Sequence, residues 1–243
     1  MTSSWHWERL ERGNTGSQEA LVGLVDPRPG ESVLDVGTGS GGLALLAART
    51  GAAVTGIDVA VDGIERARAR AREEGLDVRF DVGDAQALPY PDAAFDVVVS
   101  SFGVMFAPDQ RRAAAELARV SRDGGRLGLT LMPMDSRSAE TTTIFREFGD
   151  RDFGDHPAAF ADRIEELLGD VFDFEARCVE TSSQPGATTW DEALDQSGEL
   201  RALTTALPPD RLEDLRARVE ELLAKWAGRP ASYVIVVGRR RGP

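Results

Sequence analysis

The sequence has a single cysteine, Cys178, among 243 residues, so no disulfide can form within the chain. One cysteine is typical of proteins from reducing compartments, and it favours a cytoplasmic location. Long apolar runs are also missing, because the most apolar stretch, 95–107, contains two serines and a glycine. The first residues, MTSSWHWERLERG, lack the apolar core of a secretory signal. We therefore expect no association with a membrane.

Basic residues are scarce, because 28 Lys and Arg stand against 41 Asp and Glu, for a formal net charge of −13. Enzymes of nucleic acids usually present a basic surface that neutralises phosphates, so this balance argues against a nucleic-acid partner. The arginine-rich run Glu65 to Arg72 alternates arginine with alanine, which is typical of a solvated helix face. No cluster of His, Cys, Asp and Glu has the spacing of a metal site, so we expect no required metal.

Between residues 32 and 131, apolar segments alternate with helical patterns, which is typical of a doubly wound parallel sheet. The expected strands are 32–36, 53–57, 78–82, 95–100 and 126–131, and the expected helices are 41–49, 61–74 and 108–122. The later pattern predicts a mostly helical segment over 135–168 with a break around 150–157, helices over 188–207 and 210–226, and strands over 174–181 and 231–239. We expect one α/β domain over 1–243, with an N-terminal helical cap (1–31) and a helical lid insert after the fifth strand (133–171).

A glycine-rich turn, Gly37 to Gly42, follows the first expected strand and leads into a helix. Glycines let a ligand approach the backbone closely, and the helix N-terminus adds unpaired N–H groups. Ligands of open α/β sheets bind at such turns. Glycines 37, 39 and 42 also fit the dinucleotide pattern G-x-G-x-x-G, so the turn alone does not identify the ligand.

Three acids narrow the choice of ligand. Asp35 precedes the turn, where its charge disfavours a pyrophosphate and favours a cation such as an ammonium or a sulfonium. It could instead simply accept hydrogen bonds from the turn. Asp58 ends the second strand, where an acid accepts from both ribose hydroxyls, or it is an ordinary turn aspartate. Asp84 could accept from an adenine amino group while the N–H of Ala85 donates to a ring nitrogen, although Gly-Asp-Ala alone is only a turn signal.

The segments VLDVGTGSGG, GIDVA, GDAQALPYPDAAFD and FDVVVSS resemble motifs I to IV of the class I methyltransferases. SFGVMFAPD and the Gly-Gly turn before the fifth strand are similar to the bacterial group that includes the ubiquinone- and menaquinone-biosynthesis C-methyltransferases. The resemblance covers Ser32 to Met132. It implies a Rossmann-like, seven-stranded, mostly parallel sheet whose last strand is antiparallel, and S-adenosyl-L-methionine as the cofactor.

The resemblance also implies how this cofactor binds. Gly37 and Gly39 would flank the methionine part, Asp58 would hold the ribose, Val59 would pack on the adenine, and the backbone carbonyl of Ser100 would face the ammonium. The full implied set is Asp35, Gly37, Thr38, Gly39, Gly41, Asp58, Val59, Asp84, Ala85 and Ser100.

Three positions depart from the family pattern. Ala60 stands where a serine usually caps the second helix, so the cap must come from elsewhere, such as Asp62. Gly63 lies in the first turn of that helix at a modest cost in propensity. Met132 replaces a tryptophan that is common after the fifth strand, which changes the shape of the pocket there.

Methyl transfer is an in-line displacement, and it needs a general base only where the acceptor must lose a proton. The candidate catalytic bases are His6 in the cap and His156 in the lid insert, and each could instead be a surface or packing histidine. Tyr90 could orient a substrate or pack on its own loop. Four aromatic residues could line an apolar acceptor pocket or belong to the core: Phe145, Phe148, Phe153 and Phe160.

The sequence therefore predicts methyl transfer to an oxygen, nitrogen or carbon atom of a small molecule. It lacks the Asn/Asp-Pro-Pro-aromatic loop of amide and adenine N-methylation, and it has no Pro-Cys pair for cytosine C5 methylation. The main alternative is the same fold and cofactor pocket used for a cyclisation or rearrangement. An NAD-dependent oxidoreductase and a non-enzymatic partner subunit are further alternatives, and the sequence allows a homodimer.

Overall fold

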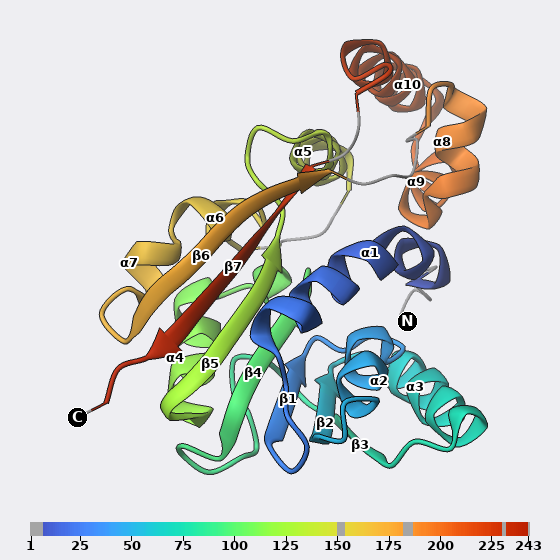
Figure 1. Ribbon diagram of the computed structural model, residues 1–243. Coiled ribbons are helices and arrows are strands. Elements are labelled where there is room, and N and C mark those ends of the chain that lie inside the picture. Colours follow the sequence, from blue (N-terminus) through green and yellow to red (C-terminus); the bar gives the residue numbers. More distant parts are fainter. Residues whose placement is uncertain (1–6, 150–153, 182–186, 230–231, 243) are drawn as a thin grey trace.

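A seven-stranded sheet with the order β3-β2-β1-β4-β5-β7-β6 runs through the computed structural model, which describes residues 7–149, 154–181, 187–229 and 232–242 (Figure 1). The strands are β1 (Ser32–Val36), β2 (Ala53–Asp58), β3 (Val78–Val82), β4 (Phe95–Ser101), β5 (Ser121–Leu131), β6 (Phe172–Thr181) and β7 (Ser232–Arg240). The pairs among β1 to β5 are parallel, whereas β7 is antiparallel to both β5 and β6. The expected fold is confirmed, including the antiparallel last strand.

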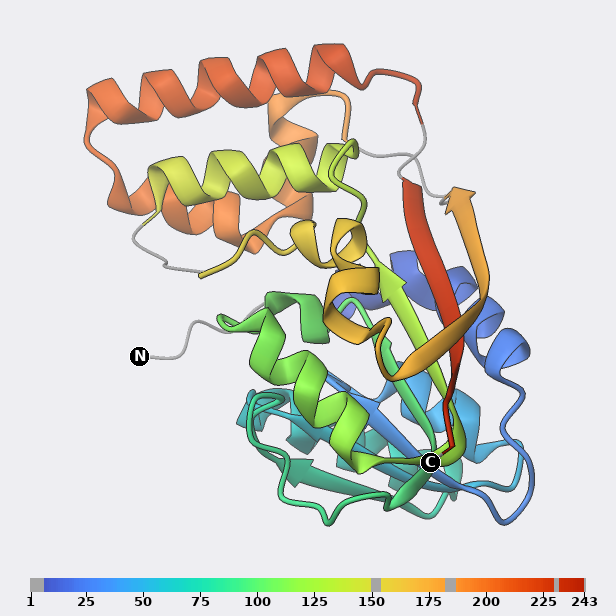
Figure 2. The same cartoon turned by 90° about the vertical axis from the view of Figure 1, so that its left-hand side faces the viewer.

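Helices cover both faces of this sheet (Figures 1 and 2). The helices are α1 (Trp7–Val25), α2 (Gly42–Ala48), α3 (Val61–Glu74), η1 (Val104–Phe106, a single 3₁₀ turn), α4 (Gln110–Val120), α5 (Arg137–Phe148), α6 (Ala159–Asp162), α7 (Ile164–Leu168), α8 (Trp190–Gln196), α9 (Gly198–Ala206) and α10 (Pro209–Lys225). Because successive strand residues point to opposite faces, Val33 packs with α1, α2 and α3, and Leu34 packs with α4, α6 and α7.

A separate helical layer stands beyond the ends of the parallel strands (Figure 2). It has its own apolar cluster: Ile144, Phe148, Ala187, Ala193, Leu200, Leu203, Leu215, Val219, Leu222 and Leu223. Of its helices, α5 belongs to the connection between β5 and β6, and α8, α9 and α10 belong to the connection between β6 and β7. The lid insert expected at 133–171 thus supplies only α5 to this layer, whereas α6 and α7 pack on the sheet.

Two helix boundaries differ from the expected ones for local reasons. The helix expected over 108–122 ends at Val120, because Ser121 is already extended and pairs with Phe95 of β4. The helix expected over 188–207 is divided at Ser197, whose hydroxyl accepts the N–H of Leu200 and so caps α9.

The described part of the chain contains no helix that combines the length and the hydrophobicity needed to cross a membrane.

Candidate cofactor-binding site

The predicted site lies where the strand order reverses, between β1 and β4. From β1 the chain continues to β2 and β3 on one side, and from β4 it continues to β5 on the other. This divergence opens a crevice beyond the carboxyl ends of the strands, where ligands of such sheets bind. The predicted cofactor residues all lie at these ends or in the turns that follow them.

The glycine turn after β1 is anchored to β2. The N–H groups of Gly37 and Thr38 both donate to the carbonyl of Ile57, at 2.8 and 3.0 Å. Gly37 and Gly41 adopt positive φ angles of 72° and 85°, which favour glycine. A Cβ atom on Gly37 would lie 2.6 Å from the Cα atom of Gly103, so this turn also touches the loop after β4.

Asp35 is a buried carboxylate at the start of this turn, with 1% of its surface exposed. The hydroxyl of Thr38 donates to its Oδ2 atom at 2.6 Å, and its Oδ1 atom is buried without a hydrogen-bond partner. Burial raises the pKa of Asp35 from 3.8 to about 7; the bond from Thr38 opposes this rise and the charge of Asp58 adds to it. A desolvated carboxylate with an unpartnered oxygen favours a nearby cation.

Asp58 accepts hydrogen bonds from two backbone N–H groups at this point. Its Oδ2 atom accepts from Gly39 at 2.9 Å, and its Oδ1 atom accepts from Ala60 at 2.8 Å. Each carboxylate oxygen has two lone pairs, so both keep a position for a further donor such as a ribose hydroxyl. Sequence reasoning missed this second role of Asp58, because it depends on how the turn folds back onto β2.

The start of α3 explains two departures from the family pattern. No side-chain cap comes from Ala60, and the Oδ1 atom of Asp58 instead accepts its N–H. Among the described residues, no hydrogen bond to Asp62 caps α3, and this acid lies in the first turn of the helix. A Cβ atom on Gly63 would lie 3.0 Å from the carbonyl oxygen of Gly39, so glycine at this position lets α3 approach the turn.

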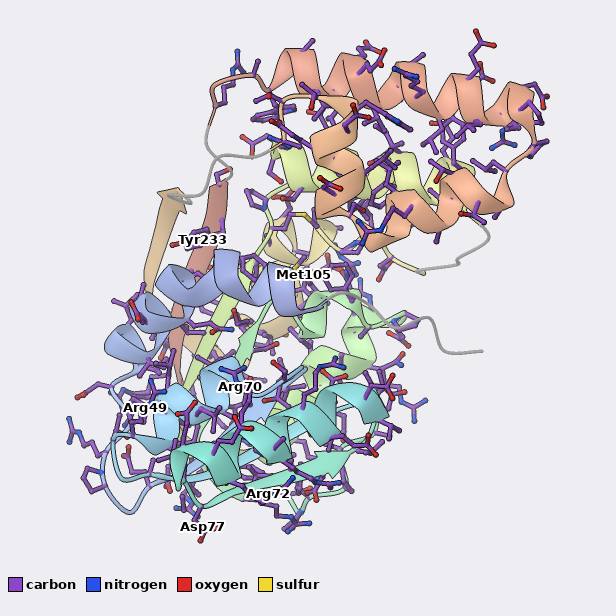
Figure 3. The ribbon with its side chains drawn as sticks, turned by 90° about the vertical axis from the view of Figure 1, so that its right-hand side faces the viewer. Arg49, Arg70, Arg72, Asp77, Met105 and Tyr233 are labelled. Carbon is purple, nitrogen blue, oxygen red and sulfur yellow. The ribbon has the colours of Figure 1, made fainter. Side chains whose placement is uncertain are left out.

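Arg70 of α3 also reaches the glycine turn. Its Nη1 atom donates to the carbonyl and to the hydroxyl of Ser40, at 3.0 and 2.9 Å (Figure 3). The neighbouring Arg68 donates to the carbonyl of Phe80. Two arginines of this helix therefore form hydrogen bonds with β3 and with the glycine turn. The alternation of arginine and alanine predicted only a solvated face.

The adenine end of the predicted site is occupied by a contact within the chain. The side-chain amide of Gln86 donates to both carboxylate oxygens of Asp84, at 3.1 and 3.0 Å, and its own oxygen accepts the N–H of Asp109 at 3.0 Å. For the N–H of Ala85, no hydrogen bond is found within the described residues. Asp84 therefore already accepts from Gln86, whereas the N–H of Ala85 stays available as a donor. Their role at the adenine edge stays a prediction.

Two exposed valines flank these polar groups. Val59 is 65% exposed and Val82 is 48% exposed, although large apolar side chains are usually covered. Val82 is paired with Asp58 in the register of β2 and β3. Both valines suit the face of a flat ring, and only Val59 was named from the sequence.

Ser100 is fully buried at the end of β4. Its hydroxyl donates to the carbonyl of Val36 at 2.6 Å and accepts the N–H of Val104 at 2.9 Å. The side chain therefore ties β4 to the strand that enters the glycine turn. The expectation from the sequence concerned only its backbone carbonyl.

His156 lies in the lid insert, half-buried, with both ring nitrogens bonded within the protein. Its Nδ1 atom accepts the N–H of Ala158 at 3.2 Å, which leaves the ring proton on Nε2, 3.2 Å from the hydroxyl of Thr143. Burial and the positive charge of Arg146 lower the pKa of His156, so the ring is neutral near pH 7. The other candidate base, His6, lies outside the described residues.

The predicted aromatic set does not form one wall. Phe160 is buried among the helices on the sheet, whereas Phe148 and Phe145 pack in the helical layer. Phe153 lies outside the described residues. Tyr90 packs edge-to-face on Phe95 and donates to Asp81, which is the packing role considered for it. Within the described ranges, no three metal-ligating side chains come together.

Comparison with known proteins identifies the family. Residues 34–129 match a family model described as a methyltransferase domain. The chain is 33% identical to 27-O-demethylrifamycin SV methyltransferase from Amycolatopsis mediterranei over 198 residues, which are 79% of this chain and 71% of that enzyme. This chain belongs to the class I S-adenosylmethionine-dependent methyltransferases. The narrower resemblance to the ubiquinone and menaquinone group stays a prediction.

Two further proteins are similar to this methyltransferase, one over about half of the chain and one over nearly all of it. An uncharacterized protein of Mycobacterium tuberculosis is 48% identical over 109 residues, so the chain spans only 40% of the length of that relative. The crystal structure of the [4+2]-cyclase SpnF has a TM-score of 0.62 and 25% identity, and the match covers 96% of this chain and 83% of SpnF.

The residues present fit the cofactor that the methyltransferase family implies. The unpartnered Oδ1 atom of Asp35 suits a positively charged donor, and Asp58 retains acceptor positions for hydroxyls. The exposed valines 59 and 82 suit an adenine ring, and Asp84 with Ala85 can bind its edge.

Proposed function

We propose that this methyltransferase transfers the methyl group of S-adenosylmethionine to an oxygen, nitrogen or carbon atom of a small molecule. The observation that carries this proposal is Asp35, a buried carboxylate with one unpartnered oxygen at the start of the glycine turn. A positively charged methionyl end would compensate this carboxylate, whereas a pyrophosphate would be repelled by it. An NAD-dependent oxidoreductase is therefore disfavoured.

When bound, S-adenosylmethionine supplies a methyl group that its positive sulfur already activates, so the residues of the chain mainly hold and orient. In this proposal, the glycine turn and the carbonyl of Ser100 bind the methionyl part, and Asp58 binds the ribose hydroxyls. Val59 packs on the adenine, and Asp84 accepts from its amino group while Ala85 donates to the ring.

The remaining tasks are exclusion of water and, for some acceptors, removal of a proton. We assign the first, within a single domain, to the cap (1–31) and to the lid insert (133–171), of which α5 stands with α8, α9 and α10 beyond the ends of the strands. His156 and His6 are the candidate bases. His156 would have to release one of its two ring contacts, with Ala158 or Thr143, before it could accept a proton.

The direct test is calorimetric titration with S-adenosylmethionine and with its product, S-adenosylhomocysteine. Asp58→Ala should raise the dissociation constant about tenfold or more, because hydrogen bonds to a charged group are lost. The matched control is Asp77→Ala, an exposed acid just after α3 that should leave binding unchanged (Figure 3). Failure of the unaltered protein to bind either compound would contradict the proposal.

A second candidate function keeps the pocket but not methyl transfer. The similarity to the structure of the cyclase SpnF favours a cyclisation or rearrangement, as does the bonded state of His156. Incubation of the protein with methyl-labelled S-adenosylmethionine and acceptors distinguishes the two candidate functions. Label in the product supports methyl transfer, and a converted substrate without label supports the second candidate.

The cellular setting is proposed from composition. The single cysteine favours the cytoplasm, and the acidic balance disfavours nucleic-acid partners and anionic membrane surfaces. We also propose a homodimer. Cell fractionation and light scattering of the purified protein test these statements.

A further inference from the structure

The exposed apolar side chains of this protein gather at one edge of the sheet. Among the described residues, six large apolar side chains are exposed, and five of them lie at or beyond the carboxyl end of a strand. These five are Val59, Val61, Val82, Phe106 and Met134. The sixth, Leu24, lies in the last turn of α1, near the start of β1. Single exposed apolar residues are ordinary, but their concentration at one edge indicates a binding surface.

The strand order divides these five side chains into two groups. The three valines follow β2 or end β3, the strands that carry the adenosine residues of the proposed function. Phe106 and Met134 follow β4 and β5, on the other side of β1, where adenosine accounts for neither. Because β4 and β5 are neighbouring parallel strands, both side chains lie at the same edge of the sheet.

The backbone that presents Phe106 is fixed beside the glycine turn. The N–H of Phe106 donates to the carbonyl of Gly103, and a Cβ atom on Gly103 would lie only 2.7 Å from the Cα atom of Gly37. The side-chain amide of Gln110 donates to the carbonyl of Met105 at 3.1 Å and holds the next turn. The 37% exposure of Phe106 is therefore maintained by contacts of its backbone, close to the proposed methionyl part.

The two segments that carry Phe106 and Met134 lack charged residues. The segments 97–108 and 127–134 contain no Asp, Glu, Lys or Arg. Of the arginines that follow them, Arg111 pairs with a carboxylate of α7, and Arg112 and Arg137 donate to backbone carbonyls. Arg112 and Arg137 keep their charge, but both lie outside the two segments. An anionic group packed on the segments themselves would lose its hydration without meeting a charge within them, which is costly.

We propose that the acceptor is an uncharged molecule whose bulky apolar part packs against Phe106 and Met134. This inference rests on the proposed function, because it takes the loops after β4 and β5 as the acceptor side of the same pocket. The unbranched side chain of Met134 adapts to different shapes, so the apolar part can vary in outline. Carboxylates and phosphates are disfavoured as the part of the acceptor that meets Phe106 and Met134.

The test uses a matched series of probes on the protein saturated with S-adenosylhomocysteine. The probes are 4-methylphenol, 4-butylphenol and 4-hexylphenol, with 4-hydroxyphenyl alkanoates of equal chain length as charged counterparts. Calorimetry should show that affinity for the alkylphenols rises with chain length, by up to about fourfold per buried methylene. Each alkanoate should bind at least about tenfold more weakly than the alkylphenol of the same length.

Three variants locate the contact. Phe106→Ala and Met134→Ala should each weaken binding of 4-hexylphenol about fivefold or more, because buried apolar surface is lost. Leu24→Ala removes an apolar side chain of similar exposure at the other edge of the sheet and should change nothing. All three variants should bind S-adenosylhomocysteine as the unaltered protein does, which also shows that they fold.

The possible outcomes separate this inference from the proposed function. Failure of the unaltered protein to bind S-adenosylhomocysteine would overturn the proposed function itself. Intact binding of S-adenosylhomocysteine with tighter binding of the alkanoates, or with no dependence on chain length, would overturn only the acceptor class. Affinity for 4-hexylphenol that Phe106→Ala and Met134→Ala leave unchanged would overturn the location. If the protein is a dimer and Phe106→Glu dissociates it, Phe106 and Met134 belong to a subunit interface. That result would also overturn the proposed location of the acceptor.

Discussion

The N–H of Gly39 donates a hydrogen bond to the Oδ2 atom of Asp58 over 2.9 Å, which joins the glycine turn after β1 to the end of β2. The same carboxylate accepts the N–H of Ala60 at the start of α3. A residue that the sequence predicted only as a ligand contact therefore also sets the shape of the turn. Loss of affinity in Asp58→Ala combines both effects.

The contact between Gly37 and Gly103 predicts a large cost for any side chain at Gly37. Gly37→Ala should lower the free energy of unfolding by about 2–5 kcal/mol, because it adds a left-handed backbone penalty to overpacking. Gly75→Ala is the matched control: its φ of 66° is similar, but its added Cβ atom meets nothing within 4 Å. Urea denaturation should show a cost of only about 1–2 kcal/mol for the control. Equal costs for the two variants would contradict the contact.

The raised pKa of Asp35 predicts opposite effects of pH on stability and on binding. Because the folded chain holds this proton up to pH about 7, while the unfolded value is 3.8, the unaltered protein should lose stability as pH rises between these values. Asp35→Asn should remove this loss, on the order of 4 kcal/mol at pH 8, in thermal denaturation scans.

Cofactor affinity should depend on the same proton. Below pH 7 the affinity of the unaltered protein for S-adenosylmethionine should fall by up to about tenfold per pH unit, because a neutral carboxyl binds a cation poorly. In Asp35→Asn the affinity should be weaker at pH 8 and independent of pH. An affinity that the unaltered protein keeps constant from pH 5 to pH 8 would contradict the role of Asp35 as partner of a cation.

The bond between Gln86 and Asp84 predicts competition with the cofactor. The amide of Gln86 offers Asp84 the same kind of donor that an adenine amino group would offer. Gln86→Ala should therefore tighten binding of S-adenosylhomocysteine about two- to fivefold, the value of one net hydrogen bond. In an Asp84→Ala background the same change should have no effect on affinity. Weaker binding in Gln86→Ala alone would show that the amide stays in place beside the ligand.

The two ring contacts of His156 predict a structural effect of its removal. His156→Ala should lower the free energy of unfolding by about 1–2 kcal/mol, because the partners in Ala158 and Thr143 lose their bonds. A loss of rate of about 100-fold or more at unchanged affinity for S-adenosylhomocysteine would additionally identify the general base. Unchanged stability would contradict the described contacts.

The sequence predicted the sheet well where local signals are strong. The bounds of β1, α3 and β3 match the expected ranges to the residue, because glycine turns and apolar runs mark their ends. The carboxyl-end positions of Asp35, Asp58 and Asp84 followed from the same pattern. Parallel strands bring such ends to one edge, so the order of strands and turns along the chain was enough to place the candidate site.

The sequence could not predict contacts between distant segments. The apolar face of α5 meets α8, α9 and α10 only through tertiary packing, so the helical layer was assigned to the lid insert alone. The contact of Gly37 with Gly103 spans 66 positions, and neither glycine signals the other. The bond from Gln86 to Asp84 depends on a side-chain rotamer, which a residue pattern does not encode.

The place of β7 in the sheet has a consequence for how the protein folds. Among the strands of the described residues, β7 comes last in sequence, yet it lies between β5 and β6 and is the one strand that pairs with β6. During synthesis, the backbone N–H and C=O groups of β6 therefore have no partner strand until residues 232–240 have left the ribosome. Chaperone binding or aggregation of nascent chains should concentrate in that interval, since unpaired strand edges associate readily.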